Sequence, residues 1–196
     1  MNERDEIRAF IAIELPAGLK SRLKDFEQKL RTPETRCAKW VDPGSIHLTL
    51  KFLGNVKVKT VEEIKQGLMA DASGGRPFTL KTAETGCFPN LRRPRVFWMG
   101  LSGDVDRLLE LQARIDESTA RLGFPREERP FTGHLTLARL RDDCTPADRS
   151  AFTEFVGGFQ MEPFSVPVAA VSLIRSQLRP EGAVYTRLAE CRLGGN

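Results

Sequence analysis

The sequence feature that most constrains this 196-residue chain is a tetrapeptide that occurs twice. His47-Leu48-Thr49-Leu50 and His134-Leu135-Thr136-Leu137 are identical, and they contain the only two histidines of the chain. In a β-strand, successive side chains point to opposite faces, so each histidine shares a face with its threonine while both leucines point the other way. Each copy is therefore predicted to be a strand that buries its leucines in a core and presents an imidazole beside a hydroxyl.

The residues around the two copies predict where these strands lie and how they are related. We expect the first strand over Ile46–Leu53 and the second over Phe131–Leu140. Each strand is followed by a helix and then by further strands, which predicts two related halves that face each other. In the first strand, strict alternation assigns to the core Ile46, Leu48, Leu50 and Phe52, and to the opposite face His47, Thr49 and Lys51.

The remaining pattern predicts a mixed fold. Apolar residues at helical spacing predict helices over 17–30, 60–70, 105–122 and 146–155. Runs rich in β-branched and aromatic residues predict strands over 8–15, 39–41, 78–83, 96–101, 164–175 and 184–193. This order has too many adjacent strands for a parallel doubly wound sheet. It favours an α+β fold with mainly antiparallel sheets.

The composition is that of an ordinary globular protein. Hydrophobic residues make up 40% of the chain and charged residues 29%, and no apolar run approaches the ~18 residues that a membrane span needs. The length suits one domain over residues 1–196, built from two halves that share an interface. The charged start lacks the features of a secretory signal, so we expect a cytoplasmic protein. The net charge of +4 is compatible with a polyanionic substrate.

The sequence offers little to hold a metal ion. With only two histidines, a zinc site would have to be assembled from scattered ligands, and no tight group of carboxylates suits a harder cation. We therefore expect no metal and no cofactor. A disulfide framework is not expected in a cytoplasmic chain of this size, so we expect four reduced thiols, at Cys37, Cys87, Cys144 and Cys191.

The paired motifs contain the groups that a displacement at phosphorus requires. Such a reaction needs a base for the attacking oxygen and an acid for the leaving oxygen, and imidazole can serve as either near neutral pH. Two threonine hydroxyls can donate hydrogen bonds to the non-bridging oxygens, where charge builds up. The alternative is that both histidines are ordinary strand residues. Their shared tetrapeptide and register favour a split active site formed by His47, Thr49, His134 and Thr136.

The two HxTx motifs resemble those of the 2H phosphoesterase superfamily, and specifically the bacterial RNA 2',3'-cyclic phosphodiesterases, historically called 2'-5' RNA ligases. The resemblance extends over nearly the whole chain. Besides the two motif blocks it covers the opening strand at Arg8–Pro16, the middle strand at Pro94–Gly100 and the closing hairpin at Ser176–Tyr185. The sequence departs from the family at Gly133, where the family usually has proline before the second histidine. Glycine loosens the entry to the strand, and we expect a modest effect on preorganisation.

The resemblance implies a bilobal, pseudo-symmetric fold with outer helices and the active-site cleft between the lobes. It also implies hydrolysis of a 2',3'-cyclic phosphate to a 2'-phosphomonoester, with His47 as proton donor and His134 as proton acceptor. Thr49 and Thr136 would hold the phosphate, and Arg139 would add a positive contact. Strict alternation puts Arg139 on the face opposite His134, so its role requires a bulge, a twist or the end of the strand.

Several functions remain open at the level of sequence. The same chemistry in reverse would join RNA ends, such as tRNA halves, through a 2'-5' linkage, and a small cyclic nucleotide or a 2'-5' oligonucleotide is an alternative substrate. A protein of another class would be a nucleotide- or RNA-binding module that keeps the cleft without turnover. The intact pair of proton carriers argues against that interpretation, because binding alone does not require them. We expect a monomer that acts on RNA ends and does not bind membranes.

Overall fold

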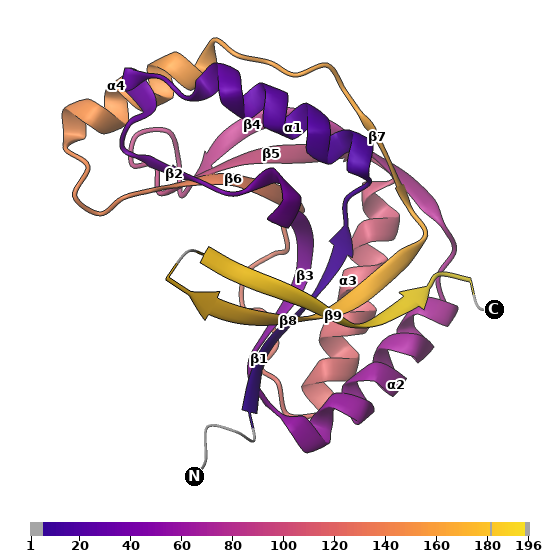
Figure 1. Cartoon of the computed structure of the whole chain (residues 1–196). Helices are drawn as coiled ribbons and strands as arrows, with labels where there is room; N and C mark the ends of the chain where they lie inside the picture. The colour runs from indigo at the N-terminus through magenta and orange to yellow at the C-terminus, as the bar shows by residue number, and fades with distance from the viewer. Residues whose placement is uncertain (1–5, 181, 195–196) are drawn as a thin grey trace.

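A single curled β-sheet organises the molecule (Figure 1). The computed structural model describes residues 6–180 and 182–194 of the chain. Within these residues nine strands join in the order β7-β4-β5-β6-β3-β1-β8-β9, with β2 beside β6, and each of these pairings is antiparallel. The strands span Glu6–Glu14 (β1), Ala38–Trp40 (β2), His47–Lys57 (β3), Phe78–Phe88 (β4), Val96–Gly103 (β5), His134–Leu140 (β6), Ser165–Val168 (β7), Ala170–Arg179 (β8) and Gly182–Arg192 (β9).

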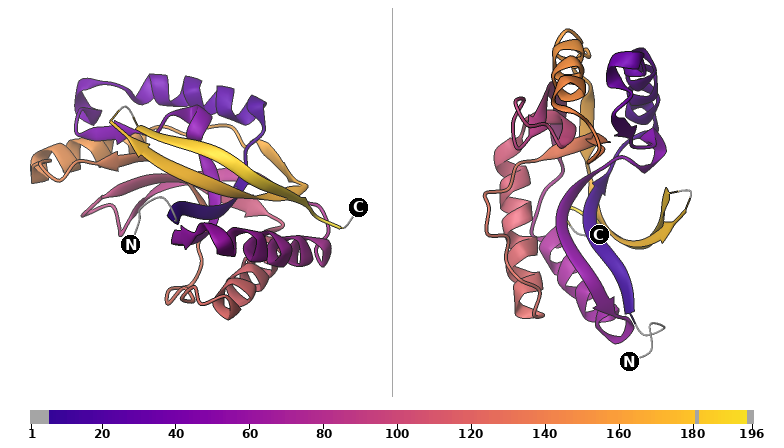
Figure 2. Two further views of the ribbon diagram at one scale, coloured as in Figure 1. Left: turned by 60° about the horizontal axis from the view of Figure 1, so that its bottom comes forward. Right: turned by 90° about the vertical axis from the view of Figure 1, so that its left-hand side faces the viewer.

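The α-helices bury one apolar stripe each. They span Ala17–Leu30 (α1), Val61–Ser73 (α2), Val105–Arg121 (α3) and Pro146–Gly157 (α4). Helix α2 packs against α3, β8 and β9, whereas α1 and α4 lie together near β4, β5 and β6 (Figures 1 and 2). Among the helices of the described residues, none has the length and apolar character needed to cross a membrane. The α+β class and the antiparallel pairing expected from the sequence are confirmed.

The two halves of the sheet exchange strands. At the centre, β3 and β6 are joined by the antiparallel pair Leu48–Leu135. Strand β4 follows the first motif along the chain but pairs with β5 in the half that carries the second motif. The hairpin β8–β9 ends the described chain but pairs through β8 with β1, in the half that carries the first motif. Each half is therefore built from both parts of the sequence.

Most expected elements are confirmed, and the differences are shifted ends and one break inside a predicted strand. Helix α1 has the predicted bounds, and the other three helices end within three residues of the prediction. The expected strand over 164–175 is wrong in detail, because the chain breaks at Ala169 into β7, which pairs with β4, and β8, which pairs with β1. The second motif strand begins at His134 rather than at Phe131.

Both motif strands contain a β-bulge at the same place. In β3, Thr49 pairs with Ala12 while Lys51 pairs with Ile11, so Leu50 is the extra residue. In β6, Thr136 pairs with Trp98 while Ala138 pairs with Phe97, so Leu137 is the extra residue. A bulge reverses the alternation of the residues that follow it. The leucine that ends each tetrapeptide therefore switches the faces of the next side chains.

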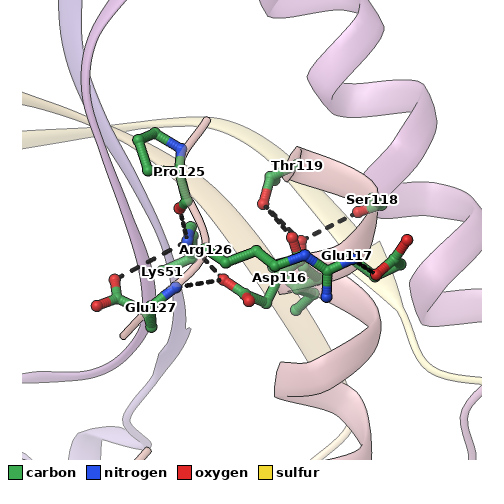
Figure 3. A network of polar contacts seen from close by, with 9 residues as sticks. Lys51, Asp116, Glu117, Ser118, Thr119, Pro125, Arg126 and Glu127 are labelled. Atoms are coloured by element: carbon green, nitrogen blue, oxygen red, sulfur yellow. Dashed lines mark hydrogen bonds and ion pairs between the residues drawn. The ribbon is translucent and has the colours of Figure 1, made fainter. Parts of the chain in front are cut away.

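The bulge in β3 corrects two expectations from strict alternation. Lys51 was expected beside His47 and Thr49 but is fully buried on the core side, and Phe52 was expected in the core but is exposed. The ammonium group of Lys51 donates hydrogen bonds to a carboxylate oxygen of Asp116 in α3 and to the carbonyl of Pro125 (Figure 3). The backbone N–H of Glu127 donates to the same Asp116 oxygen. Lys51 thus ties the first motif strand to the loop that leads toward the second.

Candidate active site

The two histidines lie on the same face of the sheet, on the two central strands. Because β3 and β6 run antiparallel through the pair Leu48–Leu135, each histidine is adjacent to the threonine position of the other strand. Both leucines of this pair are fully buried, whereas His47, Thr49, His134 and Thr136 are all half-buried. The structure therefore brings together the four side chains that the sequence predicted, around a pseudo-twofold relation between the motifs.

A hydrogen bond to the backbone orients each imidazole. His47 Nδ1 lies 2.8 Å from the carbonyl oxygen of Ser45, and His134 Nδ1 lies 2.7 Å from that of Thr132. A carbonyl oxygen can only accept, so Nδ1 must carry the hydrogen in both rings. The Nε2 atom is then left to accept a proton when the ring is neutral and to donate one when it is charged. Each histidine can therefore act as acid or base through Nε2.

Aromatic rings surround His47. The Phe10 ring is stacked on the imidazole at a centroid distance of 4.5 Å, and Tyr185 meets it edge-on at 5.3 Å. Phe10 belongs to a small apolar cluster with Ala12 and Ile174, separate from the main core. Phe10 is only 4% exposed, so it is a packed residue that supports the imidazole from below.

Burial also acts on the protonation of His47. It lowers the pKa of this imidazole, and the charge of Lys20 in α1 lowers it further. The hydrogen bond to the Ser45 carbonyl and the charge of Glu14 act in the opposite direction. Glu14 pairs directly with His47 across β1 and β3. The net effect is an imidazolium that gives up its proton more readily than a solvated one.

Different aromatic residues surround His134. Phe88 at the end of β4 meets the imidazole edge-on at 4.9 Å, and Trp98 of β5 lies at 6.5 Å. The indole of Trp98 lies against Gly86, where an added Cβ would come within 2.5 Å of the ring. Glycine at position 86 therefore leaves room for this indole beside the second motif. The sequence analysis did not single out Phe88, Trp98 or Gly86.

The bulge at Leu137 settles the face on which Arg139 lies. Arg139 pairs with Val96 and Thr136 pairs with Trp98, and Val96 and Trp98 are two residues apart on β5. Directly paired residues share a face, so Arg139 shares the face of His134 and Thr136. Burial raises the pKa of the Tyr185 hydroxyl, and the positive charges that oppose this are Arg139 and Arg8. Arg139 therefore acts electrostatically on the aromatic group beside His47.

The unusual glycine before the second histidine has a packing partner. A Cβ at Gly133 would lie 2.8 Å from the end of the Leu108 side chain, which is fully buried in α3. Glycine thus makes room for Leu108 in this chain, and a side chain at 133 would require Leu108 to move. Nothing in this contact disturbs the bond between His134 and the Thr132 carbonyl.

The other polar groups of the described residues form neither a metal site nor a second catalytic site. Within residues 6–180 and 182–194, no three His, Cys, Asp or Glu side chains come close enough together to hold a metal ion. All four cysteines are free thiols, as expected. Burial raises the pKa of Cys37 to about 12, with Cys144 contributing, and that of Cys87 to about 11, so neither is an activated nucleophile.

Comparison with known proteins gives one consistent family. The family model described as LigT like Phosphoesterase matches residues 13–98 and again residues 100–185, so that each match contains one of the two motifs. Two curated relatives are named RNA 2',3'-cyclic phosphodiesterase. The one from Methanothermobacter thermautotrophicus is 33% identical over 96% of this chain and 100% of its own length. The one from Thermus thermophilus is 34% identical over 96% of this chain and 91% of its own length.

Solved structures show the same fold. A protein of Thermus thermophilus superposes with a TM-score of 0.77 at 28% identity, covering 97% of this chain and 100% of that one. LigT from E. coli, solved in complex with 3'-AMP, superposes with a TM-score of 0.76 at 26% identity, covering 96% of this chain and 99% of that one. The curled antiparallel sheet with its helices is thus shared over nearly the full length.

Proposed function

Because this chain belongs to the LigT-like phosphoesterase family, we propose that it hydrolyses RNA ends carrying a 2',3'-cyclic phosphate and leaves a 2'-phosphomonoester. The observation that carries the proposal is the matched pair of imidazoles, both held through Nδ1 with Nε2 left for proton transfer. Two relatives that match nearly the whole chain are named for this activity. The two motifs therefore supply one acid and one base to a single phosphorus atom.

The reaction follows from placing the phosphate between the two histidines. Neutral His134 takes a proton from water through Nε2 as the water oxygen forms a bond to phosphorus. The bond from phosphorus to O3' breaks, and protonated His47 gives its Nε2 proton to that oxygen. The products are a 2'-phosphomonoester and a free 3'-hydroxyl. The two histidines end with exchanged protons and recover their starting states through solvent. The assignment of acid to His47 and base to His134 follows the family resemblance.

Three further side chains suit the charge that develops on the phosphate. The hydroxyls of Thr49 and Thr136 can donate hydrogen bonds to the two non-bridging oxygens, and Arg139 adds a positive charge on the same face. Removing one such donor typically costs about 10²–10³-fold in rate. We expect Arg139→Met to lower kcat/KM for the cyclic end, whereas Arg141→Met, which removes an exposed charge just beyond β6, should have little effect.

The direct test is product analysis with an oligoribonucleotide that ends in a 2',3'-cyclic phosphate. We expect a 2'-phosphate product, undiminished turnover in EDTA and a bell-shaped dependence of kcat/KM on pH. His47→Ala and His134→Ala should each reduce turnover by about 10²–10⁴-fold. A 3'-phosphate product, or full activity in both variants, would show that the paired histidines do not perform this chemistry. RNA binding without turnover on any cyclic or 2'-5' linked substrate would indicate a binding module instead.

We propose that the same site also joins RNA ends through a 2'-5' linkage. If a 5'-hydroxyl of RNA replaces water as the nucleophile at phosphorus, the released group is again O3', and the product is a 2'-5' linkage. The acid and base roles are unchanged. Incubating cleaved tRNA halves with the protein and assaying for joined product measures this step, and His47→Ala should abolish it. Absence of joined product at saturating RNA would restrict the protein to hydrolysis.

We propose that RNA ends are the physiological partner and that the protein acts as a monomer in the cytoplasm. All four groups of the site come from one chain, so one copy is sufficient for the proposed chemistry. Sedimentation equilibrium should give the mass of a single chain at the concentrations used for turnover. A dimer that persists on dilution would contradict this expectation.

A further inference from the structure

Two positive charges lie directly opposite each other at the end of the candidate active site. Lys39 of β2 pairs with Arg139 of β6, and β2 lies beside β6 beyond the point at which β3 pairs with it (Figure 1). Directly paired residues share a face of the sheet, so Lys39 lies on the face that carries Arg139 and His134. Trp40, the next residue along β2, packs edge-on against the buried Phe97 on the opposite face. The core thus holds β2 in place and leaves Lys39 on the active-site face.

This pair of cations has no carboxylate partner within residues 6–180 and 182–194. Both side chains are exposed, and neither Lys39 nor Arg139 forms an ion pair there. The nearest basic residues along the chain do have partners: Arg36 with Asp148 at 2.8 Å and Arg141 with Asp143 at 3.3 Å. Like charges directly opposite each other on paired strands destabilise the folded state. An anionic ligand that binds between the two cations would remove this repulsion.

The two cations lie next to the place that the proposed function gives to the reacting phosphate. On β5, the partners of Arg139 and Thr136 are two residues apart, which is about 7 Å of extended strand. Lys39 lies one strand further, and neighbouring strands are about 5 Å apart. Both side chains are long. Together they can therefore contact two anions at once, one beside Thr136 and a second next to it.

We propose that Lys39 binds the phosphate on the 5' side of the terminal nucleoside, while Arg139 contacts the cyclic phosphate. The proposal rests on the proposed function and names the substrate class, which is an RNA end rather than a nucleoside 2',3'-cyclic phosphate. In an RNA end a single ribose separates these two phosphates, so two adjacent cations match them. Lysine suits the second phosphate, because its ammonium group is a point charge on a flexible stem. The preference for RNA over a small cyclic nucleotide then comes from β2 and from neither motif.

The test compares three substrates that differ in the second phosphate. They are adenosine 2',3'-cyclic phosphate, the same nucleotide with a 5'-phosphate, and the dinucleotide ApA with a 2',3'-cyclic phosphate. In Lys39→Met we expect kcat/KM to fall about 3- to 10-fold for the two substrates that carry a second phosphate, and to stay nearly unchanged for the first. Lys39→Arg keeps the charge and should keep the preference. Lys81→Met, which removes an exposed lysine of β4 far from the site, should affect no substrate.

Three results would overturn the proposal. One is an equal loss of kcat/KM for all three substrates, or no loss for any of them. Another is a selective loss in Arg92→Met instead of Lys39→Met, which would place the second phosphate on the exposed loop between β4 and β5. The third is a lower free energy of unfolding in Lys39→Met, which would give the side chain a structural role. We expect that free energy to stay the same or to rise, because the repulsion from Arg139 is lost.

A binding measurement separates this proposal from the proposed function. Calorimetry with 2'-AMP and with ApA that carries a 2'-phosphate gives the affinity for one and for two phosphates without turnover. In Lys39→Met only the affinity for the dinucleotide should fall, and the slope of its logarithm against the logarithm of salt concentration should decrease by about 0.7, as expected for one phosphate contact. Equal slopes in the wild type and the variant would contradict the contact. If the wild type turns over none of the three substrates, the proposed hydrolysis fails, and the calorimetry still tests Lys39.

Discussion

The two catalytic candidates share their local geometry and differ in their surroundings. Both imidazoles donate through Nδ1 to the carbonyl two residues earlier, at 2.8 Å and 2.7 Å. His47 is stacked on Phe10, meets Tyr185 edge-on and lies near Lys20 and Glu14, which act on its charge in opposite directions. Identical motifs can therefore take different roles, because the residues that tune each imidazole come from other elements.

Because Lys20 and Glu14 carry opposite charges, removing one or the other should shift the pKa of His47 in opposite directions. Lys20→Met removes a positive charge that disfavours the imidazolium, so the pKa of His47 should rise. Glu14→Gln removes a negative charge that favours it, so the pKa should fall. Since the chain has two histidines, NMR titration gives two imidazole signals, and His134→Ala identifies the one from His47.

The limb of the pH–rate profile that reports His47 should shift in the same direction as the pKa of His47 measured by NMR. If His47 is the acid, the rate falls as pH rises through its pKa, so Lys20→Met shifts that limb to higher pH and Glu14→Gln to lower pH. Lys24→Met, one turn further along α1, is the matched control. Shifts of the same sign in both variants would mean that these charges act on the site through structure rather than through the field at His47.

The residues next to the motifs show where sequence reasoning stops. Alternation correctly placed the histidines and threonines on one face, because four consecutive strand residues need no more than local geometry. It misplaced Lys51 and Phe52, because a bulge depends on the pairing with β1 and leaves no signal in the strand itself. The corresponding bulge in β6, at Leu137, brings Arg139 to the site. The sequence alone could state that a bulge was needed there but not where it lies.

At the scale of elements, Lys51 is the main polar link between β3, α3 and the loop after it. Its side chain is 1% exposed and its hydrogen bonds go to Asp116 and Pro125. Lys51→Met should keep the volume but leave Asp116 without its cation, and lower the free energy of unfolding by about 3–5 kcal/mol. Urea unfolding measures this cost.

Two further variants show whether the loss comes from the ion pair. Lys57→Met, at an exposed position of the same strand, should change the free energy of unfolding by less than about 0.5 kcal/mol. Adding Asp116→Leu to Lys51→Met removes the unpaired carboxylate and should recover part of the loss. If the double variant lowers the free energy of unfolding by the sum of the two single-variant losses, then Lys51 and Asp116 do not interact.

Helix α1 contains a carboxyl group whose burial opposes folding at neutral pH. Burial raises the pKa of Glu27 to about 7, against the pull of Arg31, and one of its oxygens has no hydrogen-bond partner among the described residues. The folded state keeps the Glu27 proton up to about pH 7, whereas the unfolded chain loses it near 4.5. Between these values the folded state binds more protons, so the free energy of unfolding falls as pH rises and the cost is complete above pH 7.

Glu27→Gln should therefore stabilise the protein most at alkaline pH. The amide carries no charge to bury, so we expect a gain of about 1–2 kcal/mol at pH 8 that shrinks toward pH 5. Thermal unfolding of the wild type and the variant across this range measures the difference. Glu63→Gln, on the exposed side of α2, should show no such dependence. A gain that is equal at pH 5 and pH 8 would contradict the linkage to Glu27.

The elements differ in how far the sequence predicts them. Helix α1 was predicted to its ends, because Pro16 precedes its first residue and its buried leucines repeat at helical spacing. The break at Ala169 was missed, because residues on both sides of it have strand propensity and only their different partners separate them. The exchange of strands between the halves also depends on pairing between residues far apart in the sequence, so local patterns do not predict it.

On the scale of the whole molecule, we expect from this exchange a single cooperative unit over the described residues, 6–180 and 182–194. Strand β4 leaves the first motif's half for the second, and β8–β9 do the reverse. The main buried cluster is continuous through Leu48 and Leu135 and includes residues of all four helices. Neither half can complete its part of the sheet without strands from the other part of the chain. A bilobal shape is therefore compatible with one folding unit.

The chain has natural probes that report on each half of this unit. Trp40 and Trp98 lie on β2 and β5, in the half of the second motif, and the single tyrosine, Tyr185, lies on β9 in the half of the first. We expect tryptophan fluorescence and the fluorine NMR signal of fluorotyrosine at position 185 to give coincident urea unfolding curves, because loss of either half unpairs strands of the other. Leu135→Ala, at the junction, should lower both midpoints together. Midpoints that separate, in the wild type or in this variant, would mean that the lobes are two domains whose shared active site is assembled by docking.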